Sequence, residues 1–333
     1  MYGITNAGGG GSGTKSTLII SIDSGSTVEA YSDSTYTTLV KTATEKTAGQ
    51  FWITGLDNGT YYLRATNSGD TSTTSYTINE YGVYRITMSY FTFSLKVTFP
   101  KTCTSVSVSD GSHTYSVPSG SLASGQYTFT LRTPGTWSAT GIVPYTYVPE
   151  TSNGEGSLAK GTAQNTTKTM KSDSANGTVS GTSATLPLKL YVYNGSLGKT
   201  GATGANACPD ITTKWDHQGN GNTTTYESNR IYSVASGAYG RNFPWGFVDI
   251  KPFSKIYIDI ICSRVDQTPK FTVSSLNTSQ RYHWTGTTLV TVSLTGTSSR
   301  KVVSGDVSSV NDQCLLLVDT PYVTKSIYNV WLE

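Results

Sequence analysis

The chain has 333 residues, 14% of them charged, and a formal net charge of +3. About a quarter of the residues in a typical soluble domain are charged. Lys and Arg are scattered singly, so no window supplies the concentrated basic face that nucleic-acid binding requires. No stretch approaches the roughly 20 apolar residues of a membrane span. We therefore expect neither a nucleic-acid nor a membrane partner, and the length allows two or three domains.

The composition favours strands over helices. Ser, Thr, Gly, Asn and Tyr replace the charged residues, and 22 Tyr stand against only 3 Met. β-branched and aromatic residues suit a half-buried sheet, while Gly and Asn suit the turns between strands. Long runs of Leu, Ala, Glu and Lys are missing. The composition predicts an all-β protein.

The N-terminal segment MYGITNAGGGGSGTK, residues 1–15, is rich in glycine and cannot bury a core by itself. It lacks the basic start and apolar centre of a secretory signal, so we expect no export signal. The segment is either a flexible tail or an arm that attaches to a larger assembly. We predict the arm, with the contact made by Met1, Tyr2, Gly3 and Ile4.

An internal repeat follows the arm. GQFWIT beginning at Gly49 corresponds to GQYTFT beginning at Gly125, and NGTYYL corresponds to PGTWSA at the same offset of 76 residues. Both copies alternate apolar and polar residues between turns, as a sheet with one buried face does. The repeat predicts two tandem β-sandwich modules of immunoglobulin or prealbumin type, residues 16–91 and 92–194.

The second copy contains an insertion at about 142–180, because the offset has grown to about 102 residues at its closing strand, LPLKLYV. The inserted sequence is polar and without strong periodicity, so we expect a surface excursion. It is either a tolerated long loop or a contact loop that carries Tyr145 and Tyr147.

Glycine occupies every third position of residues 195–206, as the crowded axis of a collagen triple helix requires. Two interpretations stay open: a flexible linker, or a short neck that would make the protein a homotrimer. Both place a domain boundary here. The remaining residues, 207–333, contain strands separated by Ser, Thr and Gly turns and predict a jelly-roll-like β-sandwich.

The four cysteines are far apart, so a Cys-x-x-Cys metal or redox motif is excluded, and we predict no metal and no cofactor. Cys262 and Cys314 share strand parity with apolar neighbours and are expected to be buried small side chains. A bridge between them stays open as the alternative.

Ligand binding is predicted for aromatic side chains in turn-like segments of the last domain. Sugars stack on aromatic rings while polar groups take their hydroxyls, and the alternative is that these rings belong to the core. The predicted binding residues are Trp215, Tyr239, Arg241, Phe243, Trp245, Tyr282 and Trp284.

No catalytic residue is predicted. The sequence has only three histidines, and GSGTK, which resembles Gly-x-Ser-x-Gly only in part, lies in the arm with no strand before it. Glycoside hydrolysis needs two carboxylates beside the scissile bond. The available acids are spread singly over the last domain: Asp216, Glu227, Asp249, Asp259, Asp266 and Asp306.

Three sequence features together resemble minor structural proteins of phages that infect Gram-positive bacteria. They are the start MYGI followed by GGGGSG, the repeated unit with VTFPKTCTSVSVSDG and GQYTFTLRTPGTWSATG, and the C-terminal DIKPFSKIYIDIICSR with SIYNVWLE. The resemblance implies Ig-like modules in a head fibre, decoration protein or tail fibre. It implies other virion proteins as partners and a place on the virion surface after synthesis in the host cytoplasm.

The sequence therefore leaves four functions open. The first is a virion appendage whose last domain adheres to host-surface carbohydrate, and the second is a structural cement protein without a ligand. A polysaccharide depolymerase is the third, although the sequence lacks the short-period repeats of β-helical fibres. A cellular adhesin is the fourth, although the chain ends in IYNVWLE without a recognisable anchor.

Overall fold

The computed structural model describes residues 5–6, 14–147, 150–152, 158–160, 164–195, 215–218, 222–235, 241–244, 248–263, 269–275, 287–295, 297–311, 313–319 and 324–333. Within these ranges the chain is all-β, and the single helix is the short 3-10 turn Ser119–Ser124. The predicted fold class is confirmed. No helix among the described residues is long and apolar enough to cross a membrane.

The chain divides into two compact units. The first holds Met1–Leu95, Phe129–Gly135 and Asn176–Ala184, and the second holds Lys96–Thr128, Thr136–Ala175 and Thr185–Glu333. The division passes through the strands of the second predicted module, so most of that module belongs to the same unit as the terminal sandwich.

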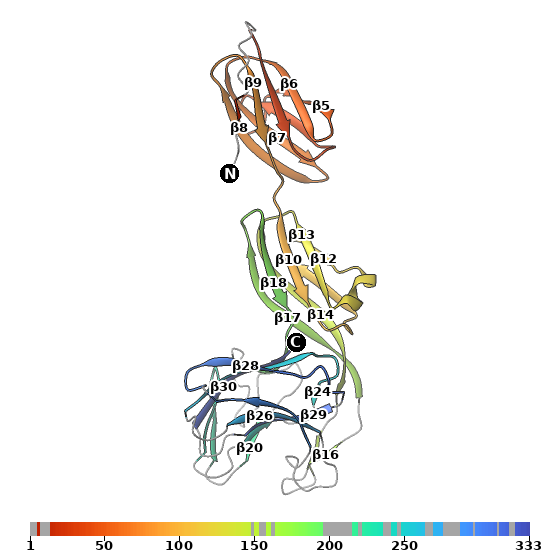
Figure 1. Ribbon diagram of the computed structural model, residues 1–333, viewed down its shortest axis with the longest axis vertical. Helices are drawn as coiled ribbons and strands as arrows, with labels where there is room; N and C mark the ends of the chain where they lie inside the picture. The colour runs from red at the N-terminus through yellow and green to blue at the C-terminus, as the bar shows by residue number, and fades with distance from the viewer. Residues whose placement is uncertain are drawn as a thin grey trace. The chain divides into compact units, whose positions relative to one another are not determined.

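The first module is a two-sheet sandwich with the strand orders β1-β9-β2-β6-β5 and β4-β3-β7-β8 (Figure 1). Its core lies between the two sheets. Within each strand, inward-facing and outward-facing residues alternate, and inward-facing residues such as Leu18, Phe51 and Leu63 are buried. The strands are β1 Thr5–Asn6, β2 Ser16–Ser21, β3 Thr27–Tyr31, β4 Leu39–Thr42, β5 Thr44–Thr47, β6 Gln50–Leu56, β7 Gly59–Asn67, β8 Asp70–Ile78 and β9 Val83–Thr87.

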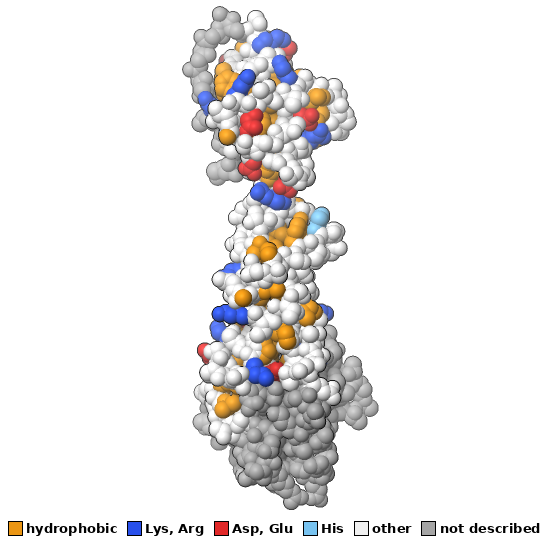
Figure 2. All heavy atoms as spheres, turned by 90° about the vertical axis from the view of Figure 1, so that its right-hand side faces the viewer, with side chains coloured by type: hydrophobic (Ala, Val, Ile, Leu, Met, Phe, Trp, Pro, Cys, Tyr) orange, Lys and Arg blue, Asp and Glu red, His pale blue; other side chains and the backbone are white. Residues whose placement is uncertain are grey.

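Two residues of the N-terminal arm form a strand. Thr5 lies opposite Arg85, and Asn6 lies opposite Tyr84, so β1 extends the sheet beside β9. The four residues predicted to attach to the virion, Met1 to Ile4, lie outside the described residues. On the first module, Lys and Arg side chains are dispersed over the face seen in Figure 2.

The strand order of the second module corresponds to that of the first without β1 and β5. Its sheets have the orders β13-β10-β18 and β12-β11-β14-β17, which correspond to β6-β2-β9 and β4-β3-β7-β8. The strand orders therefore correspond where the sequence repeats. The strands are β10 Phe93–Thr98, β11 Ser105–Ser109, β12 Thr114–Ser116, β13 Gln126–Leu131, β14 Gly135–Tyr147, β17 Gln164–Gly177 and β18 Thr182–Pro187.

The prediction that residues 142–180 form a surface excursion is wrong for most of the segment, because the described residues there belong largely to strands. β14 and β17 are long neighbouring strands, and β15 Glu150–Ser152 pairs with β16 Leu158–Lys160. Tyr145 is buried rather than presented on a contact loop. The pattern was missed because β17 buries only Met170, Ala175 and Gly177, and its other residues are mostly exposed and polar. Gly177 faces Phe93, whose ring would lie 2.4 Å from an added Cβ atom.

The terminal sandwich consists of two six-stranded sheets. One has the order β21-β22-β30-β25-β28 with β19 beside β30, and the other has the order β20-β23-β29-β26-β27 with β24 beside β29. The strands are β19 Leu190–Asn194, β20 Trp215–Gln218, β21 Asn222–Tyr226, β22 Ile231–Ala235, β23 Arg241–Pro244, β24 Val248–Asp249, β25 Lys255–Cys262, β26 Lys270–Ser275, β27 Thr288–Ser293, β28 Lys301–Asp306, β29 Gln313–Asp319 and β30 Thr324–Leu332.

The chain enters the terminal sheet before the predicted boundary at 195. The predicted closing strand of the second module is divided, since β18 stays in that module while β19 pairs with β30. Gly195 follows directly, and a Cβ atom there would lie 2.2 Å from the backbone oxygen of Asn229 and 2.4 Å from that of Tyr328. Close packing therefore requires glycine at this position. The later glycines of the triplet pattern lie outside the described residues.

Cys103 and Cys262 are buried with free thiols. Burial raises the pKa of the Cys103 thiol to about 12, and it also raises the pKa of the Cys262 thiol. Cys262 is thus a buried small side chain, as predicted, and its free thiol excludes the alternative bridge to Cys314. The backbone of Cys314 lies in the opposite sheet, beside Val248.

Candidate functional site

The predicted binding residues are described only in part. Trp215 belongs to β20, and Arg241 and Phe243 belong to β23. Trp215 lies opposite Pro244 and Gln218 lies opposite Arg241, so Trp215 and Arg241 are at opposite ends of this strand pair. The others lie outside the described residues: Tyr239, Trp245, Tyr282 and Trp284. The predicted aromatic site stays a prediction.

Described residues form a different candidate site, a cleft of about 640 Å³ between the second module and the terminal sandwich. A buried junction holds its two sides in place. The Asp249 backbone N–H donates to the Tyr145 hydroxyl at 3.0 Å, and the Thr146 N–H donates to the Asp249 carboxylate at 3.0 Å. Such bonds between buried groups fix the two strands against each other. The whole cleft belongs to one compact unit.

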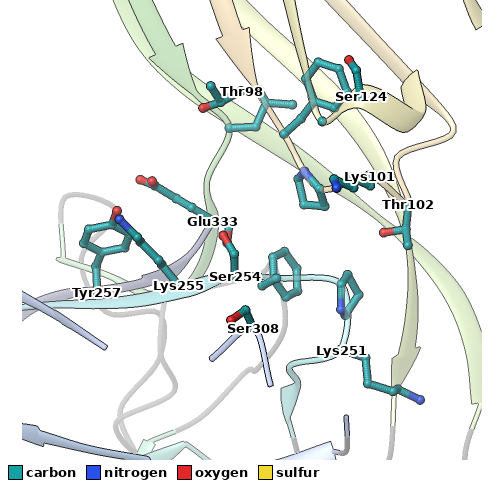
Figure 3. A pocket seen from close by; sticks show the side chains of 16 residues that line it. Thr98, Lys101, Thr102, Ser124, Lys251, Ser254, Lys255, Tyr257, Ser308 and Glu333 are labelled. Atoms are coloured by element: carbon teal, nitrogen blue, oxygen red, sulfur yellow. The ribbon is translucent and has the colours of Figure 1, made fainter. Parts of the chain in front are cut away.

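The floor of the cleft is apolar and its rim is polar. Phe99, Pro100, Leu188 and Phe253 are buried beneath it. Figure 3 shows Lys101, Thr102 and Ser124 on one side, and Lys255, Tyr257 and Glu333 on the other. An apolar base with a few converging polar groups is typical of small-molecule sites, which have volumes of about 300–1,000 Å³ and often lie between domains.

The backbone of the cleft is fixed by local pairing. The Ser254 N–H donates to the Glu333 backbone oxygen at 2.8 Å, and the Lys255 N–H donates to the same oxygen at 3.0 Å. On the other side, the Phe99 N–H donates to the Gly125 oxygen at 2.9 Å. The rim side chains therefore rest on hydrogen-bonded strand ends and tight turns rather than on long loops.

Tyr257 is the aromatic side chain on the rim of the cleft. Burial, followed by the neighbouring Glu333 carboxylate, raises the pKa of its phenol to about 12, so the hydroxyl stays protonated near neutral pH. The ring of Trp331 stacks beside Tyr257, with 5.0 Å between centroids and 3° between planes. The Trp331 indole N–H also donates to Glu333 at 2.8 Å. These contacts hold Tyr257 and Glu333 in one orientation.

Trp331 itself is buried, but not between the two sheets. It lies opposite Tyr257 and Tyr191 on the outer face of its sheet, with the Lys189 ammonium 5.1 Å above its ring. Trp331 is therefore buried on the outer face of its sheet and not in the core between the sheets. Lys189 covers the ring, so Trp331 supports the site rather than offering a free surface.

The described acids of the terminal sandwich do not form a pair across the cleft. Glu333 is the single acid among the residues that line it, whereas glycoside hydrolysis needs two. The other acids bind elsewhere: Glu227 binds Arg230, Asp259 binds Arg300, and Asp306 accepts from Ser308. No group of three metal-ligating side chains occurs in the part of the chain described.

Sequence reasoning missed Tyr257 because it concentrated on aromatics in turns. The signal was nevertheless present in KIYIDII, where three isoleucines alternate with Tyr257 and Asp259. Such alternation places the isoleucines inward and the polar residues outward. The second wall of the cleft carried no comparable signal, since Lys101 and Ser124 approach it through the tertiary fold alone.

No family model and no curated protein matches the sequence. Among solved structures, a Streptococcal ancillary pilin is 9% identical, with 87% of this chain and 86% of that chain covered and a TM-score of 0.22. An isomalto-dextranase of Arthrobacter globiformis T6, complexed with panose, is 13% identical, with 83% of this chain and 35% of that chain covered and a TM-score of 0.16. These likenesses are too distant to bear on function.

Proposed function

We propose that this chain is a non-enzymatic appendage of a bacteriophage particle that adheres to carbohydrate on the host surface. In this proposal the N-terminal arm attaches to the virion, the first module acts as a spacer, and the second module and terminal sandwich form the adhesive unit. Many weak sites on one particle would then act together, because linking binding sites raises their effective concentration.

The observation that carries the adhesive part is the chemistry of the cleft. Its apolar floor and its rim of hydroxyls and lysines match a ligand that has both an apolar face and many hydroxyl groups, which is the character of a sugar ring. Tyr257 offers a protonated phenol and an aromatic edge in a fixed orientation. The virion part of the proposal rests on the sequence resemblance.

The change Tyr257→Ala tests the adhesive part. We expect the full chain to sediment with purified cell walls of Gram-positive bacteria, and the variant to bind about tenfold more weakly because a stacking and hydrogen-bonding group is lost. Lys101→Ala, on the opposite rim, provides a second variant that leaves the aromatic packing intact.

Tyr81→Ala is the matched control, since Tyr81 is an exposed tyrosine of the first module. It should bind like the unchanged chain. If the unchanged chain fails to sediment with any wall preparation, the cement-protein alternative replaces the adhesive proposal. Release of soluble sugar from those walls would instead support the depolymerase.

A further inference from the structure

Polar and aromatic side chains continue from the cleft along the outer face of β25 and β30. Tyr257, in the cleft, lies opposite Trp331, and two residues further along β25, Asp259 lies opposite Asn329. Ile261 then lies opposite Ser326, which in turn lies opposite Tyr232 of β22. These three cross-strand positions, at Tyr257, at Asp259 and at Ile261, form three rows of side chains. Alternate residues of a strand are about 6.7 Å apart, so the three rows cover about 13 Å.

The middle row is a preorganised hydrogen-bonding group. Arg300 donates to both carboxylate oxygens of Asp259, from Nε at 3.0 Å and from Nη2 at 2.8 Å, and the Asn329 amide donates to the same carboxylate at 3.1 Å. The Arg300 guanidinium lies 3.9 Å from the centroid of the Tyr328 ring. Stacking and bidentate pairing together hold an arginine in one geometry.

Arg300 nevertheless remains open to solvent. Its side chain is 54% exposed, while the Asp259 side chain is 8% exposed. The guanidinium carries five N–H donors, and the hydrogen bonds to Asp259 use only Nε and Nη2. A ligand lying on this face would meet an oriented donor beside an aromatic edge.

The far row repeats this arrangement. Arg230 donates to Glu227 at 2.6 Å and to the Ser326 hydroxyl at 3.1 Å, and its guanidinium lies 5.0 Å from the centroid of the Tyr232 ring. The same chemistry thus occurs twice at successive positions along one sheet face, in line with the cleft.

We propose that the cleft and this outer face form one extended track that binds an internal stretch of a linear polysaccharide. This inference rests on the proposed function and specifies its ligand as a chain rather than a terminal sugar. The rows at Tyr257, at Arg300 and at Arg230 each contact a successive part of the chain. Arginine and carboxamide groups hydrogen-bond the hydroxyls, and the tyrosines contact the apolar faces of the rings.

The test compares chain lengths on the full protein. The probe is a series of linear N-acetylglucosamine, glucose, galactose and rhamnose oligosaccharides, from one to eight sugars, printed on one array. We expect affinity for the recognised sugar to rise with length until the track is filled and then to stay constant. Arg230→Gln should weaken binding of the longest oligosaccharides about tenfold and leave binding of the shortest unchanged.

Arg64→Gln is the matched control because Arg64 has the same chemistry away from the track. In the first module it donates to Glu29 at 2.9 Å and lies 4.7 Å from the centroid of the Tyr31 ring, and its exposure, 34%, is close to the 31% of Arg230. Its replacement should leave every affinity unchanged.

Two outcomes overturn the inference and differ in meaning. Equal affinity for short and long oligosaccharides, or equal effects of Arg230→Gln at all lengths, would contradict the track while leaving a cleft-bound sugar intact. Absence of binding to every oligosaccharide and to whole cell walls would contradict the proposed function itself. A length effect that Arg230→Gln removes supports the track.

Discussion

Replacing Trp137 with alanine is expected to destabilise the second module by about 3–5 kcal/mol. Trp137 has no exposed surface and lies on β14 among inward-facing residues that include Ala139 and Val143. Alanine would leave a cavity of nearly the whole indole, which the hydrogen-bonded sheets around it cannot close. Hydrogen exchange of the β11 and β14 amides measures the loss locally, as a chain of several modules requires.

Trp137→Phe separates volume from hydrogen bonding. The indole N–H of Trp137 is buried and has no hydrogen-bond partner among the described residues. Removing this N–H therefore breaks no hydrogen bond among the described residues. We expect phenylalanine to destabilise the second module by less than half as much as alanine does. Exchange rates in β11 and β14 that stay unchanged in the alanine variant would contradict the sandwich core assigned to this module.

Replacing Arg300 with alanine is expected to destabilise the terminal sandwich by about 2–3 kcal/mol. Asp259 is only 6% exposed, and without Arg300 its carboxylate keeps a single described side-chain partner, Asn329. Removing one member of a buried ion pair typically costs about 3–5 kcal/mol. We expect less here because Arg300 is more than half exposed and water can reach the vacated space.

Arg300→Lys is the companion variant. Lysine keeps the charge but cannot form the two parallel bonds or the stack on Tyr328, so an intermediate loss is expected. Arg64→Ala in the first module should cost less, because the side chain of its partner Glu29 is 20% exposed. Amide exchange in β25 and β30 measures the loss for Arg300→Ala, and amide exchange in β3 and β7 measures the loss for Arg64→Ala. Equal losses in the two variants would refute the role assigned to burial.

The sequence allowed the repeated sandwich to be predicted because its signals are local. GQFWIT and GQYTFT place aromatic and β-branched residues on one side of β6 and β13, and the turns between strands carry Gly or Asn. Each signal lies within a single strand or hairpin. The two copies share this local pattern, and the strand order β6-β2-β9 of the first module corresponds to β13-β10-β18 of the second, with β1 and β5 as additional strands of the first.

Features that depend on tertiary packing were not predictable in this way. β17 alternates too weakly to be recognised, since Phe93 fills the space left by Gly177. β19 continues the apolar run of β18 and gives no sign that it enters another sheet. The cleft joins Lys101 to Tyr257 across more than a hundred residues of sequence. No pattern within a single strand or hairpin predicts a contact between residues so far apart in the sequence.

The proposed place on a phage particle is the central claim, and electron cryomicroscopy of intact phage particles whose genome carries this sequence tests it most directly. We expect density for two similar sandwiches and a terminal sandwich on the particle surface, with residues 1–15 against a capsid or tail protein and the face of β25 and β30 turned outward. Particles without any copy of the chain, or a terminal sandwich buried against the virion with its cleft filled by a virion protein, would contradict the account.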